Sequence, residues 1–158
     1  MNQKVKNIST EEQLLQARER GLQEAAEIHS MSAHGKVFGM DAFSWINPQM
    51  DTLSTVITSF PFAAYWIASH DQVKSCLENY PEMADNLESL ILYDRTLLNV
   101  NRNILDNIPN IVCIEGISEA LEIQKAMSHQ KGVLLFTTGN INGVEQKEQF
   151  EQFVALNR

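Results

Sequence analysis

Short apolar runs alternate with amphipathic segments along most of this chain. Continuous apolar runs flanked by polar residues are typical of buried strands, and they lie at 62–69, 88–94, 110–115 and 132–136. The stretch 33–47 alternates more and predicts one or two short strands around a turn near Gly39 and Asp41. The pattern therefore predicts five or six strands separated by other elements.

The segments between these runs place apolar residues at the three- and four-residue spacing of a helix. The clearest case follows Asn47, where an apolar stripe contains Met50, Leu53, Val56, Ile57 and Phe60. Other helices are predicted at 11–30, 71–79, 96–105, 119–127 and in a final segment with Phe150, Phe153 and Val154 on one face.

Polar residues just before these segments predict where the helices begin. Asn47 is a candidate N-cap with Pro48 at the first helical position. Asp71 and Ser118 can cap the helices that follow them, and Ser9 with Glu12 fits a capping box.

Strands that alternate with helices predict a three-layer, Rossmann-like α/β domain. We expect a mostly parallel sheet of about six strands with helices on both faces and an N-terminal helix. Residues 1–10 are predicted to be a flexible N-terminus, and 11–158 a single α/β domain, because the sequence has no long linker and no internal repeat.

Composition argues against some kinds of binding partner for this protein. The chain has 158 residues and a formal net charge of −8, which argues against nucleic acid and against an anionic membrane surface. The longest near-apolar run, 60–69, is about half the roughly 20 residues of a membrane span, and the N-terminus lacks a secretory apolar region. We therefore expect a cytoplasmic protein without a membrane partner.

Cysteine and histidine positions predict no metal site and no cofactor. Cys76 and Cys113 lack a CxxC motif and are expected to be reduced thiols, in the core or half-buried. His29 and His34 do not have the spacing of a zinc pair, and His129 is expected to be solvated.

Polar residues follow every predicted strand, at the edge where open parallel sheets hold ligands. They are Asn47, His70 and Asp71, Asp94 and Arg95, Glu115 and Gly116, and the turn 137–140. Solvated turns and helix caps explain most such residues. His70 beside Asp71 or Asp94 could act as a general base, but no nucleophile motif or Walker phosphate loop accompanies the pair.

Two segments resemble the C-terminal, third domain of the Mur ligases, especially the MurD type. They are "FSWINPQMDTLSTVITSF" and "SEALEIQKAMSHQKGVLLFTTGNINGVEQKEQFEQF", and with the spacing between them the resemblance covers 36–156. The family ligates amino acids to muramyl nucleotides with ATP. The resemblance implies a Rossmann-like fold of about six strands, in a domain that closes over the nucleotide and helps to bind the amino acid.

The departures from this family concern the turns that carry its chemistry. The first turn keeps Asn47 but runs directly into Pro48, so the Ser-Lys-Ala-Thr segment and its lysine are missing. The glycine-rich turn after the next strand is replaced by "SHDQ", and the last turn reads "TTGNIN". The ATP-binding central domain is also absent, so we expect no ligase activity from this chain by itself.

Three functional hypotheses follow. The first is a non-catalytic domain that binds a protein partner or a small anionic ligand, with donors from Asn47, Thr137, Thr138, Asn140 and Asn142. The second is a small hydrolase or transferase that uses His70 with Asp71 or Asp94. The third is a subunit of a split peptide ligase that acts in trans, and a homodimer through the N-terminal helix is also possible.

Overall fold

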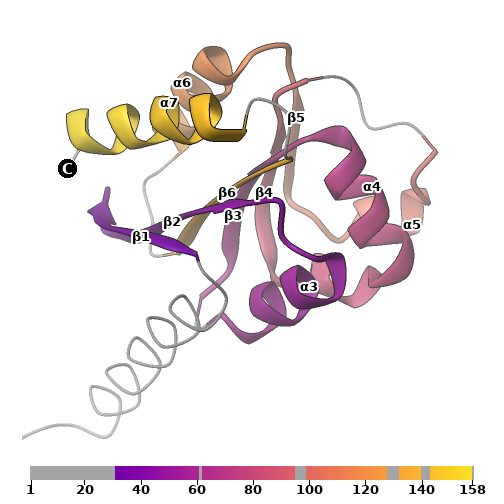
Figure 1. Ribbon diagram of the computed structural model, residues 1–158. Coiled ribbons are helices and arrows are strands. Elements are labelled where there is room, and N and C mark those ends of the chain that lie inside the picture. Colours follow the sequence, from indigo (N-terminus) through magenta and orange to yellow (C-terminus); the bar gives the residue numbers. More distant parts are fainter. Residues whose placement is uncertain (1–30, 61, 95–98, 128–131, 140–142, 158) are drawn as a thin grey trace, which may run out of the picture.

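The computed structural model describes residues 31–60, 62–94, 99–127, 132–139 and 143–157 (Figure 1). The predicted segments 1–10 and 11–30, together with His29 and His129, lie outside this described part. The strands are β1 (Ser32–Val37), β2 (Met40–Ile46), β3 (Ala64–Ala68), β4 (Leu87–Leu92), β5 (Asn110–Cys113) and β6 (Val133–Thr138). The helices are α3 (Met50–Ser59), α4 (His70–Asn79), α5 (Arg102–Leu105), α6 (Ile117–Met127) and α7 (Gly143–Leu156), with a 3₁₀ helix η1 (Pro81–Asn86).

The six strands form one sheet in the order β1-β2-β6-β3-β4-β5. Only β1 is antiparallel, and it forms a hairpin with β2 through a turn at Phe38 and Gly39, both with positive φ. The last strand along the chain, β6, lies between β2 and β3, where Leu135 is in register with both Phe43 and Trp66. The predicted mostly parallel sheet of about six strands is therefore confirmed.

Helices cover both faces of the sheet, as Figure 1 shows. On one face, α3, α4, η1 and α5 pack over Val133 and Leu135 of β6 and their neighbours. On the other face, α6 and α7 pack over Leu134 and Phe136 of the same strand. Because successive residues of β6 enter opposite cores, the strand must be apolar throughout, which explains its continuous apolar run.

The beginning of α3 differs from the prediction. Asn47 is not the N-cap: it has a left-handed φ of 49°, and its N–H donates to Thr138 O at 2.6 Å. This bond extends the ladder between β2 and β6 by one residue, so the helix begins later, at Met50, with Gln49 as its N-cap. Pairing with a strand distant in sequence thus overrides a local start signal.

Two other predicted caps are also wrong. The side chain of Ser69, not Asp71, caps α4 by accepting a hydrogen bond from Gln72 N, and Asp71 lies in the first turn of the helix. Ser118 lies inside α6, which begins one residue earlier at Ile117.

Two further predictions need correction in the part that follows β4. Of the helix predicted at 96–105, the structure describes only the short helix α5 (Arg102–Leu105), which Asn101 caps. Residues 99–101 are not helical, and 96–98 lie outside the described residues. Cys113 is exposed rather than buried or half-buried, because β5 is an edge strand, whereas Cys76 is buried as expected.

Glycine permits close packing at two positions beside β6. A Cβ at Gly132 would lie 2.7 Å from Cε1 of Tyr65, a buried ring. A Cβ at Gly143, the first residue of α7, would lie 3.0 Å from Cγ2 of Ile46. The backbone of α7 can therefore approach the end of β2 closely at Gly143.

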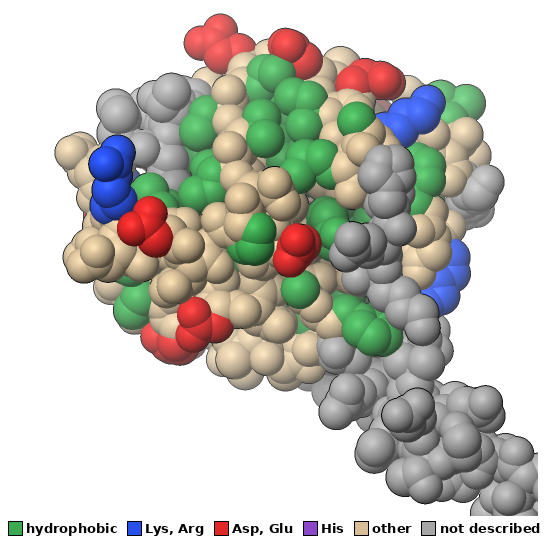
Figure 2. Space-filling model, turned by 180° about the vertical axis from the view of Figure 1, so that it is seen from behind, with side chains coloured by type: hydrophobic (Ala, Val, Ile, Leu, Met, Phe, Trp, Pro, Cys, Tyr) green, Lys and Arg blue, Asp and Glu red, His purple; other side chains and the backbone are tan. Residues whose placement is uncertain are grey.

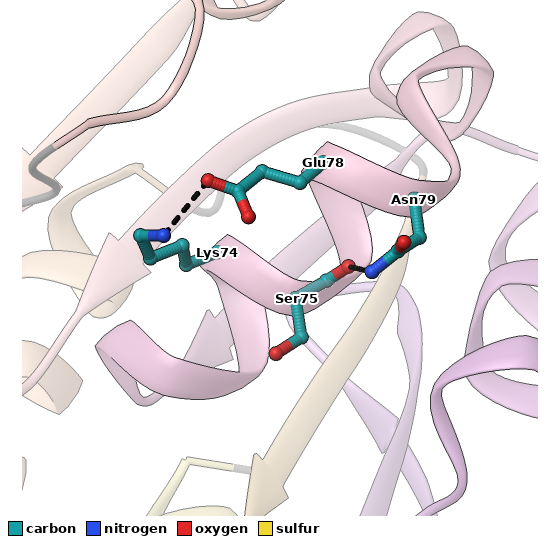
Figure 3. Close-up of polar contacts among 4 residues, drawn as sticks. All are labelled: Lys74, Ser75, Glu78 and Asn79. Carbon is teal, nitrogen blue, oxygen red and sulfur yellow. Dashed lines mark hydrogen bonds and ion pairs between the residues drawn. The ribbon is translucent and has the colours of Figure 1, made fainter.

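The outer side of α4 carries ordinary helix-surface contacts. Figure 3 shows Lys74 Nζ in an ion pair with Glu78 Oε1 at 2.8 Å and Asn79 Nδ2 donating to Ser75 O at 2.8 Å. Both pairs have the i, i+4 spacing, and such exposed contacts add only about 0.3–0.5 kcal/mol each. The functional interest of α4 therefore lies at its N-terminus.

Candidate ligand-binding site

A hollow of about 690 Å³ opens where four parallel strands end. It lies at the point where the chain order of the sheet reverses, since β6 is inserted between β2 and β3. Open α/β sheets bind ligands at such a point. Its lining residues come from the ends of β3, β4, β5 and β6 and from α7: Ser69, Asp71, Tyr93, Asp94, Gly116, Ile117, Gly139, Glu145, Gln146 and Gln149.

Three carboxylates line this hollow. Asp94 follows β4 and accepts a hydrogen bond from His70 N at 2.9 Å, at the N-terminus of α4. Asp71 and Glu145 lie in the first turns of α4 and α7. The free amides and dipole of a helix N-terminus attract negative charge, and here the chain's own carboxylates supply it. Among the lining residues named above, none is Lys, Arg or His.

The two predicted threonines of β6 face into the protein. Thr137 is fully buried; its hydroxyl accepts from Trp66 Nε1 and donates to Gln72 Oε1, both at 2.9 Å. Thr138 is fully buried as well, and its hydroxyl donates to Gln146 Oε1. Neither threonine is among the lining residues of the hollow.

Tyr93 forms part of the wall between β4 and α7. Its hydroxyl lies 3.4 Å from Thr137 O and 3.5 Å from Gln146 Oε1, and its ring stacks on Phe136 with centroids 5.8 Å apart. Burial raises the pKa of the phenol above its ordinary value, and the charge of Asp94 adds to the shift while hydrogen bonding to Thr138 opposes it. The phenol therefore stays protonated at neutral pH, and its hydroxyl is a neutral polar group in the wall of the hollow.

The structure does not join His70 to a carboxylate as an acid–base pair. Asp94 meets the backbone N–H of His70, not its imidazole. The side chain is 6% exposed, and its Nδ1 is buried without a hydrogen-bond partner among the described residues. No hydrogen bond links the imidazole to Asp71 or Asp94, all three of which the structure describes.

The predicted ligand-binding residues are thus divided among different surroundings. Asn47 lies at the end of β2 and is not in the lining, and Asn140 and Asn142 lie outside the described residues. Sequence reasoning missed Tyr93, Glu145 and Gln146. Tyr93 was taken as the end of an apolar strand run, and residues early in α7 carry no local sign that they face three strand ends.

Other features of the described residues bear on the expected partners. No group of three or more His, Cys, Asp and Glu among them could hold a metal ion. Within the same ranges, no helix is both long and apolar enough to cross a membrane. On the face shown in Figure 2, the described Lys and Arg side chains lie apart near the margins of the view instead of forming a basic patch.

Comparison with known proteins finds a likeness in structure. No family model matches the chain, and no curated protein matches it. The fold is similar to the crystal structure of a domain from a putative UDP-N-acetylmuramate:L-alanyl-γ-D-glutamyl-meso-diaminopimelate ligase from Haemophilus ducreyi. The TM-score is 0.48 at 9% identity, over 78% of this chain and 98% of the other. The chain therefore resembles a Mur ligase domain in fold, and the likeness extends no further.

Proposed function

We propose that this protein is a non-catalytic binding domain that holds a small molecule in the hollow beyond β3, β4, β5 and β6. The observation that carries the proposal is the hollow itself, where polar side chains from three chain segments meet near the point at which the chain order of the sheet reverses. Its volume of about 690 Å³ is within the range of small-molecule sites.

The chemistry of the lining supports binding without catalysis. Its hydroxyl groups are Ser69, whose Oγ accepts from Gln72 N as a helix cap, and the protonated phenol of Tyr93. Within the described part of the chain, neither hydroxyl is hydrogen-bonded to an imidazole or a carboxylate. A hydrolase or transferase needs an activated nucleophile within hydrogen-bond reach of its base, so no observation favours that hypothesis.

Titration followed by amide NMR tests the proposal. A panel of phosphate, acetate, nucleotides, amino acids, diamines and short peptides is added to ¹⁵N-labelled protein. We expect at least one compound to cause saturable shifts that cluster at Tyr93, Gly116 and Gly139, while Thr55 and Thr58 on α3 stay unchanged.

A variant that fills the hollow provides the control. Gly139 has no heavy atom within 4 Å of an added Cβ, so Gly139→Leu is expected to fold and to abolish the shifts. Gly139→Ala adds only one methyl group and should retain binding. Shifts that survive in Gly139→Leu, or a panel in which no compound binds, would contradict the proposal.

The remaining hypotheses from the sequence are also proposals, and they concern a macromolecular partner. Val144 and Leu156 of α7 are 65% and 84% exposed, but single exposed apolar residues are normal on a protein surface and favour neither hypothesis. Light scattering after size exclusion distinguishes a homodimer from a monomer, and co-purification with separately expressed Mur ligase domains tests a split enzyme.

A further inference from the structure

We infer that the ligand of the hollow carries a positively charged amine close to an uncharged oxygen acceptor, as the amino terminus of a peptide does. This inference rests on the proposed function and specifies the chemistry of the same site. It differs from the small anionic ligand expected from the sequence, and the reason lies in which groups of the lining are already engaged.

The carboxylates of the hollow are positioned to receive a cation. Among the described residues, Asp94 accepts one hydrogen bond, from His70 N to its Oδ1, which holds the carboxylate at the N-terminus of α4 and leaves Oδ2 available. Glu145 makes no hydrogen bond or ion pair with any residue of the described part. An ammonium group can donate to either carboxylate, whereas an anion would be repelled by both.

Gln146 supplies the opposite polarity. Its Oε1 receives the hydroxyl of Thr138 and lies 3.5 Å from the hydroxyl of Tyr93, so the carbonyl end of the side chain faces the protein. The amide NH₂ is the remaining polar group of a side chain that lines the hollow. This group donates, so it selects an oxygen acceptor, and an uncharged carbonyl avoids the repulsion that Asp94 and Glu145 exert on a carboxylate.

The carboxylates favour an organic ligand over a metal ion. Asp71, Asp94 and Glu145 belong to three segments, the first turn of α4, the end of β4 and the first turn of α7, around a hollow of about 690 Å³. Among the residues that the structure describes, no three acidic or metal-ligating side chains converge on one point. Charge spread in this way suits a molecule that has donors and acceptors at separate positions.

Three dipeptides test this inference by the NMR titration described above. L-alanyl-L-alaninamide has both the amine and the uncharged carbonyls and is expected to bind best. Its N-acetyl derivative lacks the charge and should bind about tenfold more weakly or worse, and free L-alanyl-L-alanine should bind several-fold more weakly because of its carboxylate. Equal binding of the amide and its N-acetyl derivative would overturn the inference.

Variants of the lining assign the roles of the individual residues. Asp94→Asn keeps an oxygen that can cap α4 but removes the charge, and should weaken the peptide amide about tenfold. Gln146→Glu and Gln149→Glu make the same charge change on the same helix. Only Gln146→Glu replaces the side-chain amide whose Oε1 accepts from the two hydroxyls and whose NH₂ is left to donate, so it alone should abolish the preference for the peptide amide over 1,4-diaminobutane. Equal effects of the two substitutions would refute the role of Gln146.

The outcomes separate this inference from the proposed function. If phosphate or acetate shifts Tyr93, Gly116 and Gly139 while the peptide amide does not, the hollow binds ligands but the inference is wrong. If no compound of the panel shifts them, both are wrong.

Discussion

The buried hydrogen-bond chain Trp66–Thr137–Gln72 allows a sharp test of how the core is held together. Thr137→Val keeps the shape and volume of the side chain but removes its hydroxyl. That hydroxyl is the partner of both Trp66 Nε1 and Gln72 Oε1, each at 2.9 Å. The substitution therefore leaves one donor and one acceptor without a partner.

The magnitude follows from the burial of these two groups. Trp66 is fully buried, so an unsatisfied indole N–H costs about 1–3 kcal/mol. Gln72 is 8% exposed, and its Oε1 can reach water with a small movement. Removing its hydroxyl partner therefore costs only about one net hydrogen bond, about 0.5–1.5 kcal/mol. We expect Thr137→Val to lower the free energy of unfolding by about 2–4 kcal/mol.

Thr137→Ser is the matched control, because it keeps the hydroxyl and loses a buried methyl group. That loss costs about 1 kcal/mol. The order of the two variants is therefore the decisive result. If burial of apolar surface alone governed this site, valine would be tolerated and serine would be the more harmful substitution.

Urea unfolding, followed by tryptophan fluorescence and far-UV circular dichroism, measures both variants. Coincident transitions justify a two-state treatment, and an unchanged m-value assigns a shift of the midpoint to stability. A loss below about 0.5 kcal/mol for Thr137→Val, or a larger loss for Thr137→Ser, would refute the reasoning.

Three further predictions concern local packing, capping and thiol reactivity. Gly132→Ala forces a Cβ to within 2.7 Å of a buried tyrosine ring and should lower the free energy of unfolding by about 1–3 kcal/mol in the same urea assay. Gly139→Ala is the control, because there is open space around Gly139, and it should change the free energy of unfolding by less than about 0.5 kcal/mol. Ser69→Ala removes the cap of α4 and should cost about 1 kcal/mol, while Ser118→Ala, inside α6, should cost at most about 0.5 kcal/mol; equal losses would contradict the observed caps. At pH 8 a disulfide reagent such as Ellman's should label only the exposed Cys113 of the native protein, because burial raises the pKa of the other thiol to about 12; two equivalents reacting at once would show that the core is open.

The candidate site was only partly predictable from the sequence. That it lies at the carboxyl ends of the strands follows from the parallel sheet, which the alternation of strands and helices predicts. Asp71 and Asp94 were recognised because they directly follow strand runs. Glu145 and Gln146 were not, since only the insertion of β6 beside β3 brings the first turn of α7 to the ends of β3 and β4.

The threonines show why adjacent residues in a strand cannot be assigned to a face from such a sequence. A strand that alternates polar and apolar residues reveals which side is buried, but β6 is buried on both faces. The hydroxyl of Thr137 donates to Gln72 near the start of α4. The hydroxyl of Thr138 donates to Gln146 of α7, on the other face of the sheet. Both looked like ligand donors because they follow an apolar run, and both hydroxyls have partners within the protein.

The sequence by itself determined most of the described helices and strands, the mostly parallel sheet and the burial of both its faces. These depend on periodicity and on continuous apolar runs, which are properties of neighbouring residues. Only the tertiary structure decided the strand order, the first residue of α3, the exposure of Cys113 and the residues that line the hollow. Each of these depends on contacts between segments far apart in the chain. The bond from Asn47 N to Thr138 O, for example, joins residues that no local pattern connects, and α3 begins after it, at Met50.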